Sequence, residues 1–217
     1  MEPLEILYQS RDLAVCVKPV GLLSQAGSGE SMVSRLSGQL GGGIHPVHRL
    51  DREVGGVMVY ARSPRAAAEL TRQMQEGGFQ KEYLAVLTGV PAEPAGELRD
   101  LLFHDQRRNK TFVVDRQRKG VREARLLYRV LDREAESSLV WVRLLTGRTH
   151  QIRAQFAARG LPLMGDGRYG GGKGKPQLWS AALTLSLPGG KRRFLRLPEK
   201  LGPFEDLETL IRSLPES

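Results

Sequence analysis

The chain has 217 residues, of which 40% are apolar and 26% are charged, and these proportions are typical of a globular chain of one domain or two closely packed lobes. Its 33 lysines and arginines exceed its 24 acidic residues, giving a net charge of +9 that indicates a polyanionic partner or a basic solvated surface. The single cysteine, Cys16, excludes internal disulfides, and because no apolar stretch is long enough for a membrane span or a signal peptide, we expect a cytoplasmic protein.

The apolar pattern predicts a chain rich in strands. Runs of apolar residues with many valines, leucines and aromatic residues occur at seven places, namely residues 6–8, 13–17, 56–60, 83–87, 126–131, 139–145 and 178–187. Helices are predicted over residues 32–40, from Pro64 to the Gly77-Gly78 pair with Ser63 as N-cap, over 149–160 and over 204–213. The glycine-rich segments 41–43 and 169–174 are predicted to be loops.

The order of these elements indicates the fold class. Two or more strands follow one another without an intervening helix between about residues 81 and 145. This order favours a mixed, largely antiparallel sheet with flanking helices over a regularly alternating parallel fold, so the expected class is α+β. The chain has no internal repeat and no linker long enough to divide it, and residues 1–217 are therefore expected to form a single domain.

A basic segment lies in the middle of the chain. Residues 105–125 carry eight lysines and arginines against three acids, a local net charge of +5. A solvated hairpin is the plainer interpretation of such a charge run, and a path for RNA is the functional one.

The tetrapeptide HRLD, which ends at Asp51, precedes a probable buried strand. A carboxylate at the start of such a strand, paired with an arginine, stays ionised and can attack an electrophile or accept a proton. A structural pair between an arginine and Asp51 at a strand start is the plainer interpretation of the tetrapeptide alone, so Asp51 needs support from the rest of the chain.

Two further motifs contain groups that could act in chemistry. The segment QKEYLAV places Lys81 and Tyr83 on one face of a predicted strand, where the tyrosine ring could stack on a base, although an ordinary half-buried tyrosine is the alternative. In LLTGRTHQIRAQF, Thr149 could cap a helix whose first turns carry Arg148, His150 and Arg153, an arrangement that attracts phosphate or carboxylate. The alternative is an amphipathic helix with solvated arginines.

These motifs together resemble one family. The order ILYQSRDLAVCVKPVGLL, HRLDREVGGVMVYA, QKEYLAVLTG and TGRTHQIRAQFAARGLPLMGDGRYG resembles the RluA-type pseudouridine synthases over roughly residues 5–190. The resemblance implies the pseudouridine synthase fold, with a central RNA-binding cleft, and the isomerisation of uridine to pseudouridine in ribosomal or transfer RNA. Because no atom is gained or lost, it implies no cofactor and no metal, and the sequence has neither zinc-ligand spacing nor a phosphate-binding loop.

The resemblance also assigns roles to residues of this chain. Asp51 would be the catalytic carboxylate, Arg153 would keep it ionised, and Tyr83 would stack on the uracil and assist proton transfer. Arg49 would enter the RNA stack as the target base flips out. The remaining expected positions are the RNA contacts Lys81, Arg148, His150, Arg107, Arg108 and Lys110, and Leu178 in the pocket wall.

The chain departs from the family pattern at two places. Residues 54–56 are Val-Gly-Gly where the family usually has Thr-Ser-Gly, which removes two hydroxyls that could brace the loop. Residues 178–180 are Leu-Trp-Ser where the family tends to have Leu-His-Ala. We also expect that no separate N-terminal RNA-binding module precedes the catalytic domain.

Two other classes of function remain open. A noncatalytic RNA-binding or ribosome-assembly protein could keep the same fold and basic surface, although the set Asp51, Tyr83 and Arg153 argues against it. A metal-free hydrolase that uses Asp51 with His48 or His150 is less well supported, because the chain has no Ser or Cys nucleophile motif. The expected partner is RNA, without membrane or DNA, and the expected state is a monomer.

Overall fold

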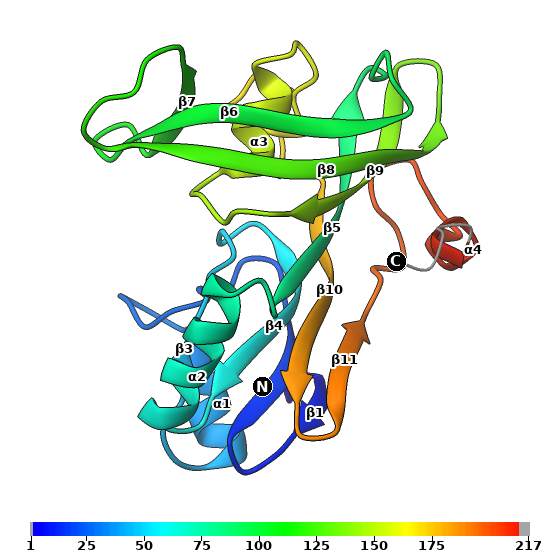
Figure 1. Cartoon of the computed structure of the whole chain (residues 1–217). Coiled ribbons are helices and arrows are strands. Elements are labelled where there is room, and N and C mark those ends of the chain that lie inside the picture. The colour runs from blue at the N-terminus through cyan, green and yellow to red at the C-terminus, as the bar shows by residue number, and fades with distance from the viewer. Residues whose placement is uncertain (1, 213–217) are drawn as a thin grey trace. The chain divides into compact units, whose positions relative to one another are not determined.

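A computed structural model describes residues 2–212, which fold as two compact units. The first unit runs to Lys81 and also contains Ser180–Leu197, and the second contains Glu82–Trp179 and the residues from Pro198 onward (Figure 1). The chain therefore passes between the units three times, within β5 (Gln80–Thr88), within β10 (Leu178–Leu187) and between Leu197 and Pro198. That the whole chain acts as one catalytic domain stays a prediction.

The first unit is a sheet with two helices, and its pairs β1–β2, β2–β4, β3–β4 and β10–β11 are antiparallel. Its strands follow the order β1-β2-β4-β10, with β3 on β4 and β11 on β10. Its remaining elements are β1 (Ile6–Gln9), β2 (Leu13–Lys18), α1 (Met32–Leu40), β3 (His45–Pro46), β4 (Gly55–Ala61), α2 (Pro64–Gln75) and β11 (Gly190–Leu195).

Burial explains why these residues form a sheet. Every residue of β4 is buried, and side chains from β2, β4, α2, β10 and β11 form one apolar cluster that includes Val15, Val59, Leu70 and Leu183. The α2 helix packs on β3 and β4, and it begins as predicted, with the Ser63 side chain accepting a hydrogen bond from the Ala66 amide. Cys16 is fully buried in β2.

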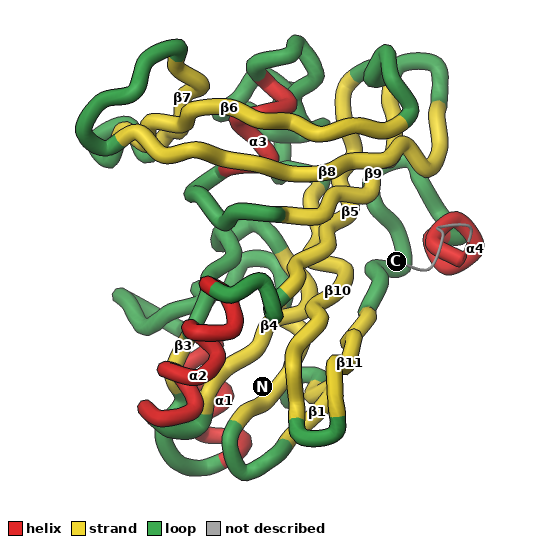
Figure 2. Tube along the Cα trace, in the orientation of Figure 1, coloured by secondary structure: helices red, strands yellow, loops and turns green. Residues whose placement is uncertain are grey.

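The second unit is a sheet of long strands with a short helix against it. Its strands follow the order β5-β9-β8-β6-β7, and Figure 2 shows the long strands β6 and β8 side by side. Its other elements are β6 (Ala95–Asp105), β7 (Lys110–Val114), β8 (Val121–Arg133), β9 (Ser137–Leu144), α3 (Gln151–Ala157) and α4 (Leu207–Arg212). Ala154 of α3 packs against Leu102 and Ala124, which fixes the helix on β6 and β8.

The expected α+β class is confirmed, as are all seven predicted strands and the four predicted helices. Five of the predicted strands extend further in the structure, β10 has the predicted bounds, and β9 begins earlier but ends at residue 144 and not 145. Three strands together with the short β3 were not predicted: β6, β7 and β11. The last helix begins at Leu207 and not at Phe204, and its expected end at Ser213 lies outside the described residues.

Candidate active site

Asp51 lies in a tight turn of the first unit, immediately before β4. The Val54 amide donates a hydrogen bond to the Asp51 carbonyl oxygen at 3.0 Å, which closes the turn. The preceding Leu50 is buried, and its carbonyl oxygen accepts a hydrogen bond from the Ser24 hydroxyl at 2.8 Å. Asp51 itself is half-buried. The turn thus holds the backbone of the carboxylate on both sides, at the start of a fully buried strand.

Lys18 stabilises this turn through hydrogen bonds to its backbone carbonyl groups, a role that the sequence did not reveal. Its side chain is fully buried at the end of β2, and its Nζ donates to the carbonyl oxygens of Pro19 at 3.0 Å, Arg52 at 3.2 Å and Val54 at 2.7 Å. Burial lowers the pKa of Lys18 to about 8, and the negative charge of Asp51 acts in the opposite direction. A charged residue that ends the apolar strand LAVCVK was the available signal.

His48 is a structural residue of the same segment. Its Nε2 accepts a hydrogen bond from the Val59 amide at 3.1 Å, and its ring meets the Phe79 ring edge-on at 5.4 Å. Burial lowers the pKa of His48 to about 3, and the positive charge of Lys81 acts in the same direction. The imidazole is therefore neutral, with its proton on Nδ1. This geometry does not support the hydrolase interpretation with His48 as a base.

The arginines of the turn differ in their surroundings. Arg49 is exposed between the buried His48 and Leu50, so its side chain projects from a backbone held on both sides. Arg52 donates its Nε to the Gly21 carbonyl oxygen at 2.8 Å, while the Gly21 amide donates to the Arg52 carbonyl oxygen at 2.7 Å. Arg52 therefore ties the turn to the loop after β2.

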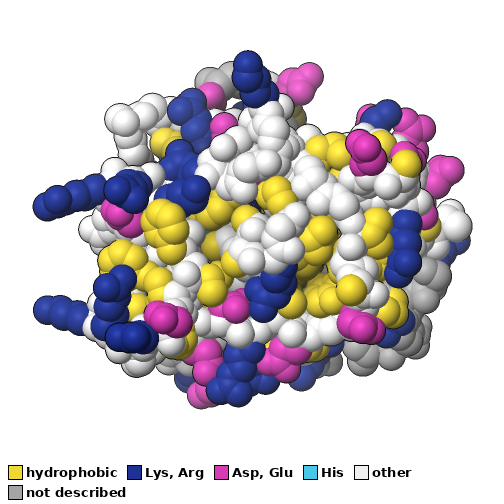
Figure 3. Space-filling model, turned by 90° about the horizontal axis from the view of Figure 1, so that it is seen from above, with side chains coloured by type: hydrophobic (Ala, Val, Ile, Leu, Met, Phe, Trp, Pro, Cys, Tyr) yellow, Lys and Arg dark blue, Asp and Glu magenta, His cyan; other side chains and the backbone are white. Residues whose placement is uncertain are grey.

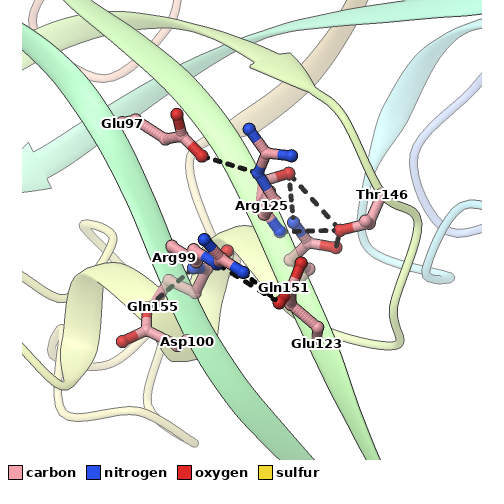
Figure 4. Close-up of polar contacts among 8 residues, drawn as sticks. All are labelled: Glu97, Arg99, Asp100, Glu123, Arg125, Thr146, Gln151 and Gln155. Atoms are coloured by element: carbon pink, nitrogen blue, oxygen red, sulfur yellow. Dashed lines mark hydrogen bonds and ion pairs between the residues drawn. The ribbon is translucent and has the colours of Figure 1, made fainter.

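In the second unit, α3 begins differently from the prediction. The N-cap residue is His150 in a left-handed conformation, with φ of 52°, and the helix has no side-chain cap, so the expected cap by Thr149 is wrong. Gln151 organises the turn instead: its Oε1 accepts from the Thr146 hydroxyl at 2.8 Å and from the Arg148 amide at 3.0 Å. Figure 4 shows Gln151 with Thr146 and Arg125, whose carbonyl oxygen accepts from the Gln151 side chain. The first residues of α3, Gln151 and Ile152, are buried.

Arg153 is buried and has an ion-pair partner that the sequence did not suggest. Its Nε and Nη2 donate to the two carboxylate oxygens of Asp166 at 2.6 and 2.8 Å, and the Asp166 side chain is only 1% exposed. The solvated arginine of the amphipathic alternative is thus wrong at Arg153, whereas Arg148 is exposed and donates its Nε to the Glu123 carbonyl oxygen at 2.9 Å. Asp166 is the lone acid in the glycine-rich segment MGDGRYG, and this feature of the sequence could have indicated a structural role for it.

The other expected site residues are distributed between the units. Tyr83 is buried in β5, and not half-buried as in its plainer interpretation. His150 is also buried, and its Nδ1 lies 3.0 Å from the Tyr169 hydroxyl, so its contact with RNA stays a prediction. In the first unit, Lys81 is half-buried with its Nζ 5.9 Å from the centre of the Phe79 ring. Leu178 is buried at the start of β10.

The basic segment forms two turns at one end of the second unit. Arg107 and Arg108 lie exposed in the turn between β6 and β7, where the Asp105 carboxylate accepts hydrogen bonds from both of their amides at 2.9 and 3.1 Å. The Lys110 side chain is half-buried, with its Nζ 5.1 Å from the centre of the Tyr169 ring. Figure 3 shows Lys and Arg side chains gathered at the left of the molecule, the end where these green turns lie in Figure 1.

The arginines further along the strands are neutralised. Arg99 and Arg125 lie opposite each other on β6 and β8. Arg99 pairs with Glu123 at 2.8 Å, and Arg125 pairs with Glu97 at 2.6 Å, as Figure 4 shows. Within the basic segment, Arg125 thus pairs across the strands, whereas in the turn Arg108 lies 3.7 Å from the Asp105 carboxylate and Arg107 is exposed.

Comparison with known proteins identifies the family of the chain. The family model described as RNA pseudouridylate synthase matches residues 12–158, which contain Asp51, Tyr83 and Arg153. The chain belongs to this family.

Curated pseudouridine synthases are similar to the chain over part of their length. An uncharacterized RNA pseudouridine synthase of Aquifex aeolicus is 36% identical over 181 residues, which cover 77% of this chain and 56% of that protein. The ribosomal large subunit pseudouridine synthase D of Xanthomonas campestris is 33% identical over 203 residues, covering 89% of this chain and 60% of that protein. The chain thus spans less than two thirds of the length of these relatives.

A solved structure has the same fold as this pseudouridylate synthase family member. The human RNA pseudouridylate synthase domain containing 1 superimposes with a TM-score of 0.79 at 23% sequence identity, with 100% of both chains covered. At this identity the likeness supports the fold alone.

The departures from the family pattern at residues 54, 55 and 180 lie in the first unit. Gly56, which follows the pattern, has φ of 120°, and a Cβ built on it would lie 2.7 Å from the Ser180 amide nitrogen, so only glycine fits between β4 and β10. The Ser180 hydroxyl donates to the Val57 carbonyl oxygen at 2.9 Å. Val54 is buried, and its carbonyl oxygen accepts the bond from Lys18. The segment without the usual Thr-Ser hydroxyls is therefore held by Lys18 and by a hydroxyl on the neighbouring strand.

Metal clusters and membrane-spanning helices are both absent from the described part of the chain. Within residues 2–212, no three His, Cys, Asp or Glu side chains are grouped so that they could hold a metal ion. In the same residues, the helices are too short or too polar to cross a membrane.

Proposed function

We propose that this chain is an RNA pseudouridine synthase and that its substrate is ribosomal large-subunit RNA. The observation that carries the proposal is Asp51, in a turn braced by the buried Lys18, within a segment that matches the family model. The choice of ribosomal over transfer RNA is supported by relatives named ribosomal large subunit pseudouridine synthase D, such as that of Xanthomonas campestris.

In the proposed reaction, Asp51 either attacks the ribose or removes a ribose proton. The bond between C1′ of the ribose and N1 of the uracil breaks, the uracil turns, and a new bond joins C1′ to C5. The proton on C5 leaves to solvent and N1 gains a proton, so the product is an isomer of the substrate. We propose that Arg153 pairs with Asp51 and keeps it ionised, and that Tyr83 stacks on the uracil and assists proton transfer.

RNA binding in this proposal uses the exposed arginines. Extrusion of a base costs a few kcal/mol, which phosphate contacts and stacking must offset. Arg49, which projects from a rigid turn, would enter the RNA stack in place of the flipped base. Arg107 and Arg108 would contact phosphates, because their side chains are exposed in the turn and, among the described residues, form no ion pair across the strands. Lys81, Arg148 and Lys110 would make further RNA contacts, and the Leu178 side chain would form part of the pocket wall.

The proposal includes a monomer that acts in the cytoplasm without a cofactor. The second candidate is a noncatalytic RNA-binding or ribosome-assembly protein, which the basic turns would also suit. A catalytic assay separates these two candidates.

The test is tritium release from RNA labelled at C5 of uracil, with large-subunit ribosomal RNA fragments and transfer RNA compared as substrates. We expect release from ribosomal RNA without strand cleavage. Asp51→Asn should abolish it, because the amide is nearly isosteric but cannot act as a charged nucleophile or base. Asp12→Asn, which changes an exposed aspartate of the same unit, is the matched control. RNA binding without release by the wild type would favour the noncatalytic candidate, and release from transfer RNA alone would correct the substrate.

A further inference from the structure

The loop that carries Asp166 is built to hold its carboxylate in one place. The Asp166 amide donates to the Leu163 carbonyl oxygen at 3.0 Å, and its own carbonyl oxygen accepts from the Gly171 amide at 2.9 Å and the Tyr169 amide at 3.0 Å. A Cβ on Gly171 would lie 2.8 Å from the Leu163 carbonyl carbon, so glycine is required for this close approach. The carboxylate that binds Arg153 therefore comes from a tightly folded loop, and not from a flexible surface side chain.

Tyr169 of the same loop restrains Arg153 in a second direction. Its ring centre lies 5.0 Å from the guanidinium carbon. Its hydroxyl accepts a hydrogen bond from the Thr111 amide at 2.7 Å and lies 3.0 Å from Nδ1 of His150, so the ring is anchored at its far end. Asp166 thus fixes the guanidinium within its plane, and Tyr169 fixes it across its plane.

This geometry has a consequence for the chemistry of Arg153. Asp166 engages the guanidinium at both Nε and Nη2, so the group is held in one orientation. We propose that Asp166 and Tyr169 are positioning residues, which fix Arg153 in the orientation that the reaction requires. This inference rests on the proposed function, in which Arg153 keeps the catalytic carboxylate ionised.

The loop also contacts the base of the basic turn. The Arg168 guanidinium donates to the carbonyl oxygens of Arg108 and Asn109, and Lys110 lies over the Tyr169 ring. The element that orients Arg153 therefore supports the turn proposed to bind RNA as well. Changes to the Tyr169 ring should lower turnover through Arg153, while the exposed arginines of the turn still provide affinity.

The first experiment replaces the guanidinium from outside. Arg153→Ala leaves the buried Asp166 carboxylate without the side chain that engages it here, and guanidinium ions at low millimolar concentration can bind there. We expect guanidinium to raise the melting temperature of this variant. We also expect its rate of tritium release to be at least tenfold higher in guanidinium than in sodium at the same ionic strength. In the double variant Arg153→Ala/Asp166→Asn, neither effect should occur.

The two readouts separate the inference from the proposed function. If the wild type releases no tritium, the proposed function fails, while the melting temperatures still report whether Asp166 holds a guanidinium. If the wild type is active but guanidinium rescues the single and double variants equally, the positioning role of Asp166 is overturned. Full activity of Arg153→Ala would overturn the positioning inference as well.

The second experiment tests the ring of Tyr169. Tyr169→Leu should lower the single-turnover rate at saturating RNA by about 10²-fold, because a small misplacement of a catalytic group has this effect, with RNA affinity within about twofold of the wild type. Tyr169→Phe, which keeps the ring, should retain most of the rate. The control is Asp100→Asn, which should leave the rate unchanged; the Asp100 carboxylate accepts hydrogen bonds from Arg159 and from Gln155 of α3. Figure 4 shows Asp100 with Gln155. Equal rates for the Leu and Phe variants would contradict the role of the ring.

Discussion

Nζ of Lys18 donates a hydrogen bond of 2.7 Å to the carbonyl oxygen of Val54, and both residues are buried. Val54 closes the turn that carries Asp51, so a cation at the end of β2 holds the backbone of the proposed catalytic loop. The same ammonium group binds two more carbonyl oxygens nearby. Loss of this one side chain would remove a donor from three carbonyl groups, of which the Arg52 carbonyl keeps its bond from the Gly21 amide.

Lys18→Met should lower turnover by about tenfold or more, because the chain length is kept but the turn loses its bracing, and each unsatisfied buried acceptor costs about 1–3 kcal/mol. The measurement is the single-turnover rate at saturating RNA, with thermal unfolding to verify the fold. The control is Lys200→Met, since Lys200 pairs with Glu205 at the surface. A folded Lys18→Met variant with the wild-type rate would show that the turn holds itself.

Gly56→Ala should destabilise the protein by about 3 kcal/mol or more, because a Cβ at φ of 120° collides with the Ser180 backbone. Gly29→Ala separates the cost of the backbone conformation from the cost of the collision. Gly29 has φ of 118° but open space around a Cβ, so its change should cost only about 1–2 kcal/mol. Urea unfolding of both variants measures the difference. Equal losses would mean that β4 and β10 separate easily at this point.

The basic turn can be tested with two double variants that change the net charge of the protein by the same amount. Arg107→Gln/Arg108→Gln should weaken RNA binding and reduce the slope of log affinity against log salt by about 0.7–0.9 for each phosphate that the variant no longer neutralises. The control is Arg99→Gln/Arg125→Gln, which changes net charge equally but removes arginines paired with glutamates. Binding titrations at several salt concentrations give both slopes. Equal slopes for the two double variants would identify the turn as solvated surface, and saturating RNA should restore turnover of the first variant.

Arg49→Ala should depress turnover even at saturating RNA, since its proposed role begins after binding, when the base leaves the stack. The defect should be smallest on RNA whose target uridine is already unpaired. Single-turnover kinetics on a paired and an unpaired version of one substrate provide the comparison. An equal defect on both substrates would place the role of Arg49 outside base extrusion.

His48 should make folding sensitive to acid. Its pKa is about 3 in the folded state, so between pH 6.5 and 3 the unfolded chain binds a proton that the folded protein does not, and stability rises with pH through this window. The unfolding free energy of the wild type minus that of His48→Gln should therefore fall as the pH is lowered from 6.5 to 5, by up to about 1.4 kcal/mol per pH unit. Urea unfolding at several pH values measures it. A difference independent of pH would mean that His48 protonates in the folded protein.

The sequence predicts the apolar strands of this fold well and its charged strands poorly. β4 is buried throughout, so its apolar run is a direct signal. β6 alternates charged residues with apolar ones, and its outward Glu97 and Arg99 are stabilised by ion pairs with β8, which become visible only when the strands are paired. β11 is exposed except at Phe194, and its order depends on pairing with β10.

The site shows the same division between local motif and tertiary contact. Asp51 and Arg153 belong to short motifs that can be read in the chain. Lys18 reaches carbonyl oxygens 34 and 36 residues away, and Asp166 reaches Arg153 through a loop whose glycines permit the approach. The cap by Thr149 was mispredicted because the side chain of Gln151 organises that turn through contacts with other strands.

The bond from the Ser180 hydroxyl to the Val57 carbonyl oxygen bears on how this protein can be recombined with its relatives. Residues 54–55 lack the hydroxyls of the usual family pattern, while position 180 carries one where the family tends to have alanine. Residues 54–55 and residue 180 should therefore be exchanged together when segments of this chain are replaced by those of a relative. A chimera that takes Thr-Ser at 54–55 but keeps Ser180 adds polar groups to a buried strand, and one that takes alanine at 180 alone removes a brace. Only the joint exchange preserves a matched pair of strands.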